Sequence, residues 1–133
     1  MKHRTAPWLA LIMLTLSVAA CGTRQPVYNV ENMPVPASTH KLSATDVGTT
    51  IQRVAHTRGW VLRPVAPGEF QGTLAWKDHE ATARILYTAN SYSITLINSR
   101  NLDQEDGKIH RKYNARVMQL KQEIDRSLAQ EAM

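Results

Sequence analysis

Two histidines have the greatest capacity for chemistry in this chain. His79 follows a predicted turn, and His110 is the second residue of the hexapeptide Ile-His-Arg-Lys-Tyr-Asn at positions 109–114. Imidazole titrates near neutral pH and binds divalent metals, so two histidines with a carboxylate nearby would form a weak metal site or an acid–base pair. The chain has no His-x-x-x-His spacing. We therefore favour structural hydrogen bonds for both histidines, with a small-ligand or metal-binding module as the alternative.

The structural interpretation places these residues around one predicted loop. In it, His110 and Asn114 bind loop residues 98–102 to the start of the last helix, and His79 fixes the turn at Asp78. No Gly-x-Ser-x-Gly elbow surrounds Ser99, and the chain has no phosphate-binding glycine loop and no His-Glu-x-x-His. We expect no enzyme activity, no metal and no cofactor. The candidate ligand or structural residues are His79, Ser99, Asn101, His110, Tyr113 and Asn114.

Composition limits the class of protein. The 133 residues suit one domain, and 16 Lys+Arg against 11 Asp+Glu give a net charge of +5. Two of the cations, Lys2 and Arg4, lie in the first four residues, so the remaining excess is too small to indicate a nucleic-acid partner. The single cysteine, Cys21, excludes an internal disulfide and a cysteine-built metal site.

The first 20 residues predict a signal peptide. Lys2 and Arg4 precede an apolar run from Trp8 to Ala20, which as a helix would measure roughly 20 Å against the ~30 Å hydrocarbon core of a bilayer. The tetrapeptide Val18-Ala19-Ala20-Cys21 resembles the lipobox of bacterial lipoproteins. This resemblance implies cleavage before Cys21 and lipidation of its thiol. Gly22, rather than Asp, follows the cysteine, as in enterobacterial lipoproteins of the outer membrane that face the periplasm.

Residues 21–42 are predicted to be the lipidated cysteine and a flexible tether. Three prolines interrupt the segment, and its apolar residues have no sustained period. A fully extended tether of this length would reach on the order of 60 Å. As an alternative, residues 27–30 would form a strand that binds a partner.

The remaining residues, 43–130, are predicted to form a small α+β domain. Ser43 and Asp46 suit the start of a helix, and Gly59 suits its end. Alternating apolar residues predict four strands at 60–63, 70–76, 79–87 and 92–96, joined by short turns. A second helix of about 20 residues is predicted by apolar residues at helical spacing, namely Ile109, Tyr113, Val117, Leu120, Ile124 and Leu128. The expected fold is a two-layer sandwich: a helix, a four-stranded antiparallel meander and a C-terminal helix.

Motifs between Gly59 and Leu120 resemble a family of small proteobacterial outer-membrane lipoproteins of unknown function. The resemblance depends on Lys77-Asp78-His79 before the third strand and on the hexapeptide at 109–114, which is kept entire. Where the family usually has Trp, two residues after Asn114, this chain has Arg116. The resemblance implies a periplasm-facing lipoprotein and does not imply an activity.

The predicted last helix begins with cations. Lys108, Arg111, Lys112 and Arg116 precede its acidic residues, and Lys121 and Arg126 follow further along. A solvated helix face is the simpler interpretation, and contact with an anionic envelope surface is the alternative. We expect a lipid-anchored, non-catalytic module for protein interaction or envelope maintenance. Its partners would be the membrane, through the N-terminal lipid, and an envelope protein.

Overall fold

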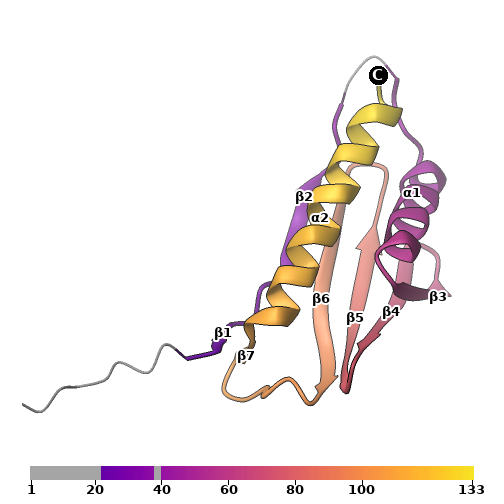
Figure 1. Ribbon diagram of the computed structural model, residues 1–133. Helices are drawn as coiled ribbons and strands as arrows, with labels where there is room; N and C mark the ends of the chain where they lie inside the picture. Colours follow the sequence, from indigo (N-terminus) through magenta and orange to yellow (C-terminus); the bar gives the residue numbers. More distant parts are fainter. Residues whose placement is uncertain (1–21, 38–39) are drawn as a thin grey trace, which may run out of the picture.

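The computed structural model describes residues 22–37 and 40–133, which form two helices and seven strands (Figure 1). In chain order these are β1 (Arg24–Pro26), β2 (Val30–Pro34), α1 (Ala44–Thr57), β3 (Trp60–Ala66), β4 (Glu69–Trp76), β5 (His79–Tyr87), β6 (Ser91–Arg100), β7 (Lys108–His110) and α2 (Arg111–Glu131).

Strands β2 to β6 form one antiparallel sheet in the order β2-β6-β5-β4-β3. The predicted α+β class and the meander from β3 to β6 are confirmed. Residues alternate in burial along the central strands, so that Leu74, Ile85 and Ile94 lie on the covered face while Leu86 is 41% exposed. Because of this alternation, one face of the sheet is apolar and forms one side of the hydrophobic core.

Helix α1 begins where the sequence predicts. The Ser43 hydroxyl accepts a hydrogen bond from the Asp46 amide, and the Asp46 carboxylate accepts one from the Ser43 amide. These bonds to the charged form lower the pKa of Asp46 below its usual value. After the helix, Gly59 adopts a φ of +85°, a left-handed conformation that glycine adopts without strain.

Both helices cover the same face of the sheet (Figure 1). Gly48 lets α1 lie close to Tyr87 at the end of β5, because a Cβ atom at position 48 would lie 2.6 Å from the Tyr87 ring. Trp60 is buried in the core, and Trp76 and Tyr87 are partly buried and pack against it. The buried stripe of α2 consists of Tyr113, Asn114, Val117, Leu120, Ile124 and Leu128. Sheet and helices thus form the expected two layers.

The predicted flexible tether at residues 21–42 is wrong for most of its described part. Strand β2 pairs with β6, with Val30 opposite Ile94 and Met33 opposite Tyr92, so the sheet has five strands rather than four. Val30, Val35 and Leu42 are buried in the core. The prolines and the absence of a regular apolar pattern suggested a flexible segment. Burial of its apolar side chains and pairing of β2 with β6 instead hold the segment on the domain. The alternative, a strand at 27–30 that binds a partner protein, is not supported either, because Val30 pairs with Ile94 of the same chain.

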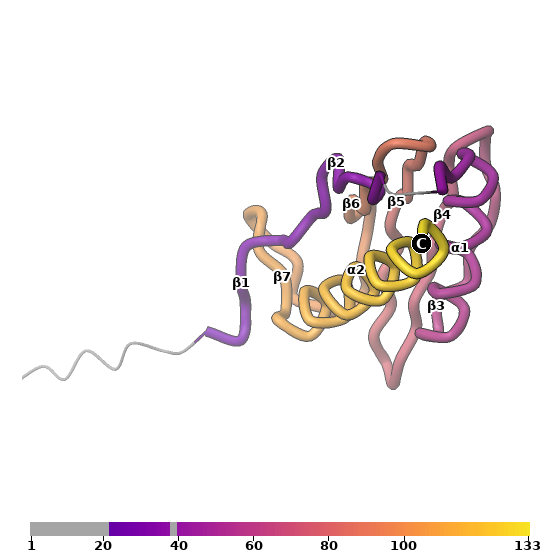
Figure 2. The backbone as a smooth tube through the Cα atoms, turned by 90° about the horizontal axis from the view of Figure 1, so that it is seen from above, coloured from indigo at the N-terminus to yellow at the C-terminus, as the bar shows by residue number. Residues whose placement is uncertain are grey.

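Strands β1 and β7 form a separate two-stranded sheet at the start of α2 (Figure 2). Arg24 lies opposite His110, and Pro26 lies opposite Lys108. Ile109, predicted as the first residue of the last helix, is therefore a buried strand residue, and the helix begins at Arg111. The N-terminal segment thus contacts the domain at two places, beside α2 and beside β6.

The two faces of β5 provide a test of the core. Ile85 is fully buried, and its neighbour Leu86 lies on the uncovered face. We expect Ile85→Ala to lower the free energy of unfolding by ~2–5 kcal/mol, because it removes buried methyl groups and leaves a cavity. Leu86→Ala, the matched control, should change it by less than about 0.5 kcal/mol. Urea denaturation measures both, and equal losses would show that the faces are wrongly assigned.

Candidate functional site

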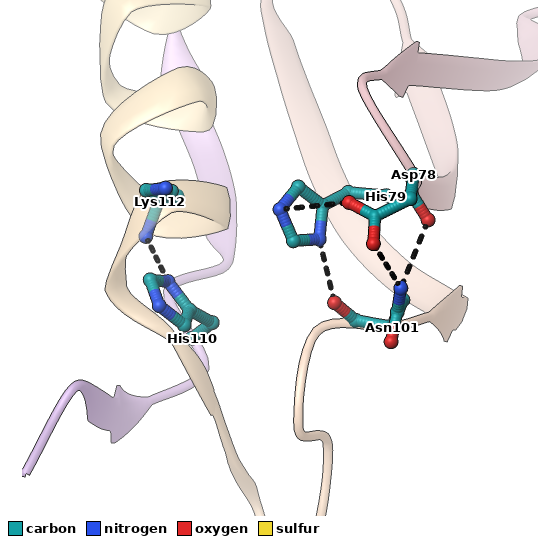
Figure 3. A network of polar contacts seen from close by, with 5 residues as sticks. All are labelled: Asp78, His79, Asn101, His110 and Lys112. Atoms are coloured by element: carbon teal, nitrogen blue, oxygen red, sulfur yellow. Dashed lines mark hydrogen bonds and ion pairs between the residues drawn. The ribbon is translucent and has the colours of Figure 1, made fainter.

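His79 is held at the start of β5 by the loop that follows β6 (Figure 3). Its Nδ1 lies 2.6 Å from the carbonyl oxygen of Asn101, and because a carbonyl only accepts, Nδ1 carries the proton. The Nε2 atom lies 3.6 Å from the carboxylate of Asp78. The Asn101 side-chain amide donates to the same carboxylate at 2.7 Å, from a backbone with a φ of 62°. The turn, the ring and the loop therefore support one another.

His110 caps α2. Its Nδ1 accepts a hydrogen bond from the Lys112 amide at 3.2 Å, which satisfies one of the free amides of the first helical turn (Figure 3). Its own amide donates to the Leu102 carbonyl at 2.8 Å. The structural expectation is confirmed in part. His79 contacts Asp78 at the turn, and the backbone amide of His110 binds the loop to the helix start, whereas the hydrogen bond of the His110 ring lies within the first turn of α2.

The two imidazoles lie near each other without a shared polar partner. Their ring centroids are 6.4 Å apart and their planes are tilted by 32°. In both rings the Nδ1 atom is already in a hydrogen bond within the protein. Residues 22–37 and 40–133 contain no group of three or more His, Cys, Asp or Glu residues placed to hold a metal ion.

A cation–aromatic contact extends this cluster along α2. The Trp76 ring lies 5.2 Å from the His79 ring, and the Arg116 guanidinium carbon lies 4.4 Å from the centroid of a Trp76 ring. A guanidinium over an indole face is attracted by the ring quadrupole and shields its apolar surface. Arg116, expected from the sequence to be one of several cations at the start of the last helix, therefore joins α2 to the end of β4.

Ser99 and Asn101 border a shallow polar hollow. Ser99 lies in β6, which continues past a bulge to Arg100, so this part of the expected loop is a strand. Its hydroxyl donates to the Gln104 side chain at 2.5 Å. The hollow has a volume of about 550 Å³, and its lining residues belong to 98–107 and do not include His79 or His110.

Asn114 binds a different segment from the one predicted. Its side chain is buried, and its Oδ1 accepts from the Tyr28 amide at 2.9 Å while its Nδ2 donates to the Pro26 carbonyl at 2.9 Å. A weaker contact reaches the Gln25 side chain. The expected bond to loop 98–102 is wrong, because Asn114 faces the connection between β1 and β2. The buried side-chain amide of Asn114 therefore accepts one hydrogen bond from the N-terminal backbone and donates another to it.

Tyr113 is a core residue. Its ring is fully buried in α2, and its hydroxyl has no hydrogen-bond partner within the described part of the chain. Burial raises the pKa of the Tyr113 phenol, because the charged form would lose its hydration. Tyr92 differs, since its hydroxyl donates to Asp125 at 2.6 Å; burial and this bond together raise the pKa of Tyr92.

Five of the six candidate residues divide into two groups, and the sixth, Ser99, lies apart from both at the polar hollow. His79, Asn101 and His110 surround the junction of β5, the loop and α2, whereas Tyr113 and Asn114 serve the core and the N-terminal segment. The predicted lipidation position, Cys21, lies outside the described residues. Sequence reasoning missed Tyr28 and the contact between Trp76 and Arg116. The sequence feature that could have indicated Tyr28 is the segment 27–30, which contains apolar and aromatic residues. This segment is too short and irregular to show the periodicity of a strand or a helix.

Comparison with known proteins gives no further assignment. No protein-family model matches the chain, and searches of curated proteins and of solved structures also find no match.

The Asn114 amide provides a test of how the N-terminal segment is held. Asn114→Ala should lower the free energy of unfolding by about 1–3 kcal/mol, because it leaves the Tyr28 amide and the Pro26 carbonyl without their partner. It should also make residues 22–30 more sensitive to limited proteolysis. Gln119→Ala, on the exposed side of the same helix, is the control. Unchanged stability and cleavage in Asn114→Ala would contradict the role of this amide.

The histidines allow a direct comparison of the structural and ligand interpretations. His110→Ala should cost about 1 kcal/mol, the usual loss for an N-cap. It should leave the loop before β7 in place, because the bond to the Leu102 carbonyl comes from the backbone amide of residue 110, which alanine keeps. Calorimetric titration of the wild-type protein, with affinity tags removed, should show no appreciable binding of zinc or nickel near pH 7. Micromolar binding of one equivalent that disappears in both folded His79→Ala and His110→Ala would instead establish the ligand-binding alternative.

Proposed function

We propose that this chain is a lipoprotein of the bacterial outer membrane that faces the periplasm, and that its domain is a non-catalytic module for protein interaction or envelope maintenance. The observation that carries the proposal is the sequence Val18-Ala19-Ala20-Cys21 after a short apolar run, with Cys21 as the single cysteine of the chain. A lipid on Cys21 accounts for the cysteine and for the basic, apolar and small residues before it.

The described domain is compatible with this anchor. It begins directly after Cys21, since Gly22 and Thr23 precede β1. No helix within residues 22–37 and 40–133 is long and apolar enough to cross a membrane.

A non-catalytic role is supported by how the candidate polar residues are used. The side chains of His79 and Asn114 make hydrogen bonds that join separate parts of the fold, and the His110 ring caps α2. These contacts account for most of the hexapeptide at 109–114 without a substrate. A small-ligand or metal-binding module remains the second candidate, and the 6.4 Å between the His79 and His110 rings is the observation in its favour.

The uncovered face of the sheet supports a protein partner. Val61 is opposite Thr73, which is opposite Thr82, so the three residues share one face across β3, β4 and β5. Val61 is 70% exposed, and Leu86 on the same side is 41% exposed. The same face carries Arg63, Gln71 and Arg84, which lie opposite one another. Charged, polar and apolar side chains therefore mix on this face, which suits a moderately polar protein interface.

Cys21→Ser tests the anchor. Wild-type protein should fractionate with the outer membrane, and mass spectrometry of its N-terminal peptide should find an acylated Cys21. Cys21→Ser should leave the membrane fraction or remain uncut, with the same unfolding midpoint, because residue 21 precedes the described core. Thr23→Ala, two residues later, is the control and should remain anchored. Continued anchoring of a correctly cut Cys21→Ser protein would contradict the proposal.

A further inference from the structure

The chain enters the fold at the first turn of α2. The Arg111 amide donates to the Thr23 carbonyl at 2.8 Å, and Arg24 pairs with His110 in the β1–β7 sheet. The next contacts follow without a gap, since the Val27 amide donates to the Gly107 carbonyl and the Tyr28 amide donates to Asn114. From Thr23 onward the segment is therefore part of the domain.

The distance from the anchor to the domain is consequently short. Two residue steps separate Cys21 from Thr23 and span at most about 7 Å in an extended chain. The interfacial layer of a bilayer leaflet is itself about 5–8 Å thick. An acyl chain on Cys21 would thus hold β1, β7 and the start of α2 at the headgroups.

The charges at this end of the molecule determine which surface faces the lipid. Lys108, Arg111 and Lys112 are exposed and make no ion pair with another described residue. The first turn of α2 contains no acidic residue, so the positive end of the helix dipole is not compensated by its own helix. This arrangement weakens an isolated helix and favours contact with anions.

Acidic residues of the preceding loop limit the attraction. Asp103, Glu105 and Asp106 lie at the same end, and Glu105 is paired with Arg24 at 3.4 Å. The net charge of the whole end is therefore small. The short connection brings this end to the membrane, and the three exposed cations then orient it.

We infer that the end of the domain formed by β1, β7 and the first turn of α2 lies directly against anionic phospholipid headgroups, with Lys108, Arg111 and Lys112 in contact with phosphates. The inference rests on the proposed anchoring at Cys21. Helix α2 then extends away from the bilayer, and its 21 residues span about 32 Å. The C-terminal end of α2 lies at the opposite end of the molecule (Figure 1), so it is presented to the periplasm.

Two labels on one helix test this orientation. Ala115 and Ala129 are exposed on α2 and are separated by about 21 Å along its axis. Each is changed to Cys in otherwise full-length protein, in which lipidation leaves no other free thiol, and is spin-labelled. The protein is placed in vesicles of phosphatidylethanolamine with a minority of phosphatidylglycerol and a nickel-chelating lipid. Relaxation of the label by headgroup-bound nickel reports its distance from the surface.

We expect relaxation to be several-fold stronger at Ala115→Cys than at Ala129→Cys. A Gly/Ser spacer of about 15 residues inserted after Cys21 should remove most of the difference, because it restores a flexible tether. Arg111→Glu with Lys112→Glu should reduce the difference, whereas Lys41→Glu with Arg126→Glu, the same change of charge on other parts of the surface, should not.

The outcomes separate this inference from the proposed anchor. Equal relaxation at the two labels in an acylated protein would overturn the orientation and leave the anchor intact. A difference that survives the spacer would overturn the role of the short connection, and one that survives Arg111→Glu with Lys112→Glu would overturn the contact of these cations with phosphates. A purified chain whose N-terminal peptide carries no acyl group would contradict the proposed function, and the orientation with it.

Discussion

One buried amide fixes the connection between β1 and β2 and thereby joins the two places where strand pairing holds the N-terminal segment. Asn114 lies on the covered side of α2 and bonds both the Pro26 carbonyl and the Tyr28 amide. A buried primary amide is costly unless its donor and acceptor are both used, so the native fold must keep the chain at this place. From there the chain continues into β2, which completes the sheet beside β6. Helix α2, which covers the sheet, thus also determines where the N-terminal segment joins the sheet.

This arrangement couples the proposed anchor to the core. Val30 and Val35 are buried, and Asn29 accepts a hydrogen bond from the Leu96 amide beside the pairing of β2 with β6. A long flexible tether would let the domain search a volume of tens of ångströms around its lipid. A segment bound to α2 and β6 instead holds Thr23 at the start of α2, two residues after the proposed anchor in the sequence. The hexapeptide at 109–114 supplies contacts within the fold, since His110 caps α2 and Asn114 holds the connection between β1 and β2.

Most of the fold could be predicted because it follows local rules. The Ser43 and Asp46 cap, the Gly59 stop and the alternating residues of the meander are recognisable within short windows. Strand β2 was missed because it contains Asn32 at a φ of 47° and ends at Pro34, and because its partner is some 60 residues away in β6. The candidate site was predicted in part, since His79 and His110 do support the loop. The partner of Asn114 could not be predicted, because a lone polar residue on an apolar helical stripe does not indicate which backbone it binds.

Amide hydrogen exchange of Val27, Tyr28 and Arg111 tests the central claim most directly. Each of these amides donates to a partner on another segment, at Gly107, Asn114 and Thr23 respectively. If the residues after the anchor belong to the fold, the three amides should exchange with protection that approaches that of β4 and β5 in the core. Exchange of all three at the rate of an unstructured peptide, with β4 and β5 still protected, would contradict the account and restore a flexible tether.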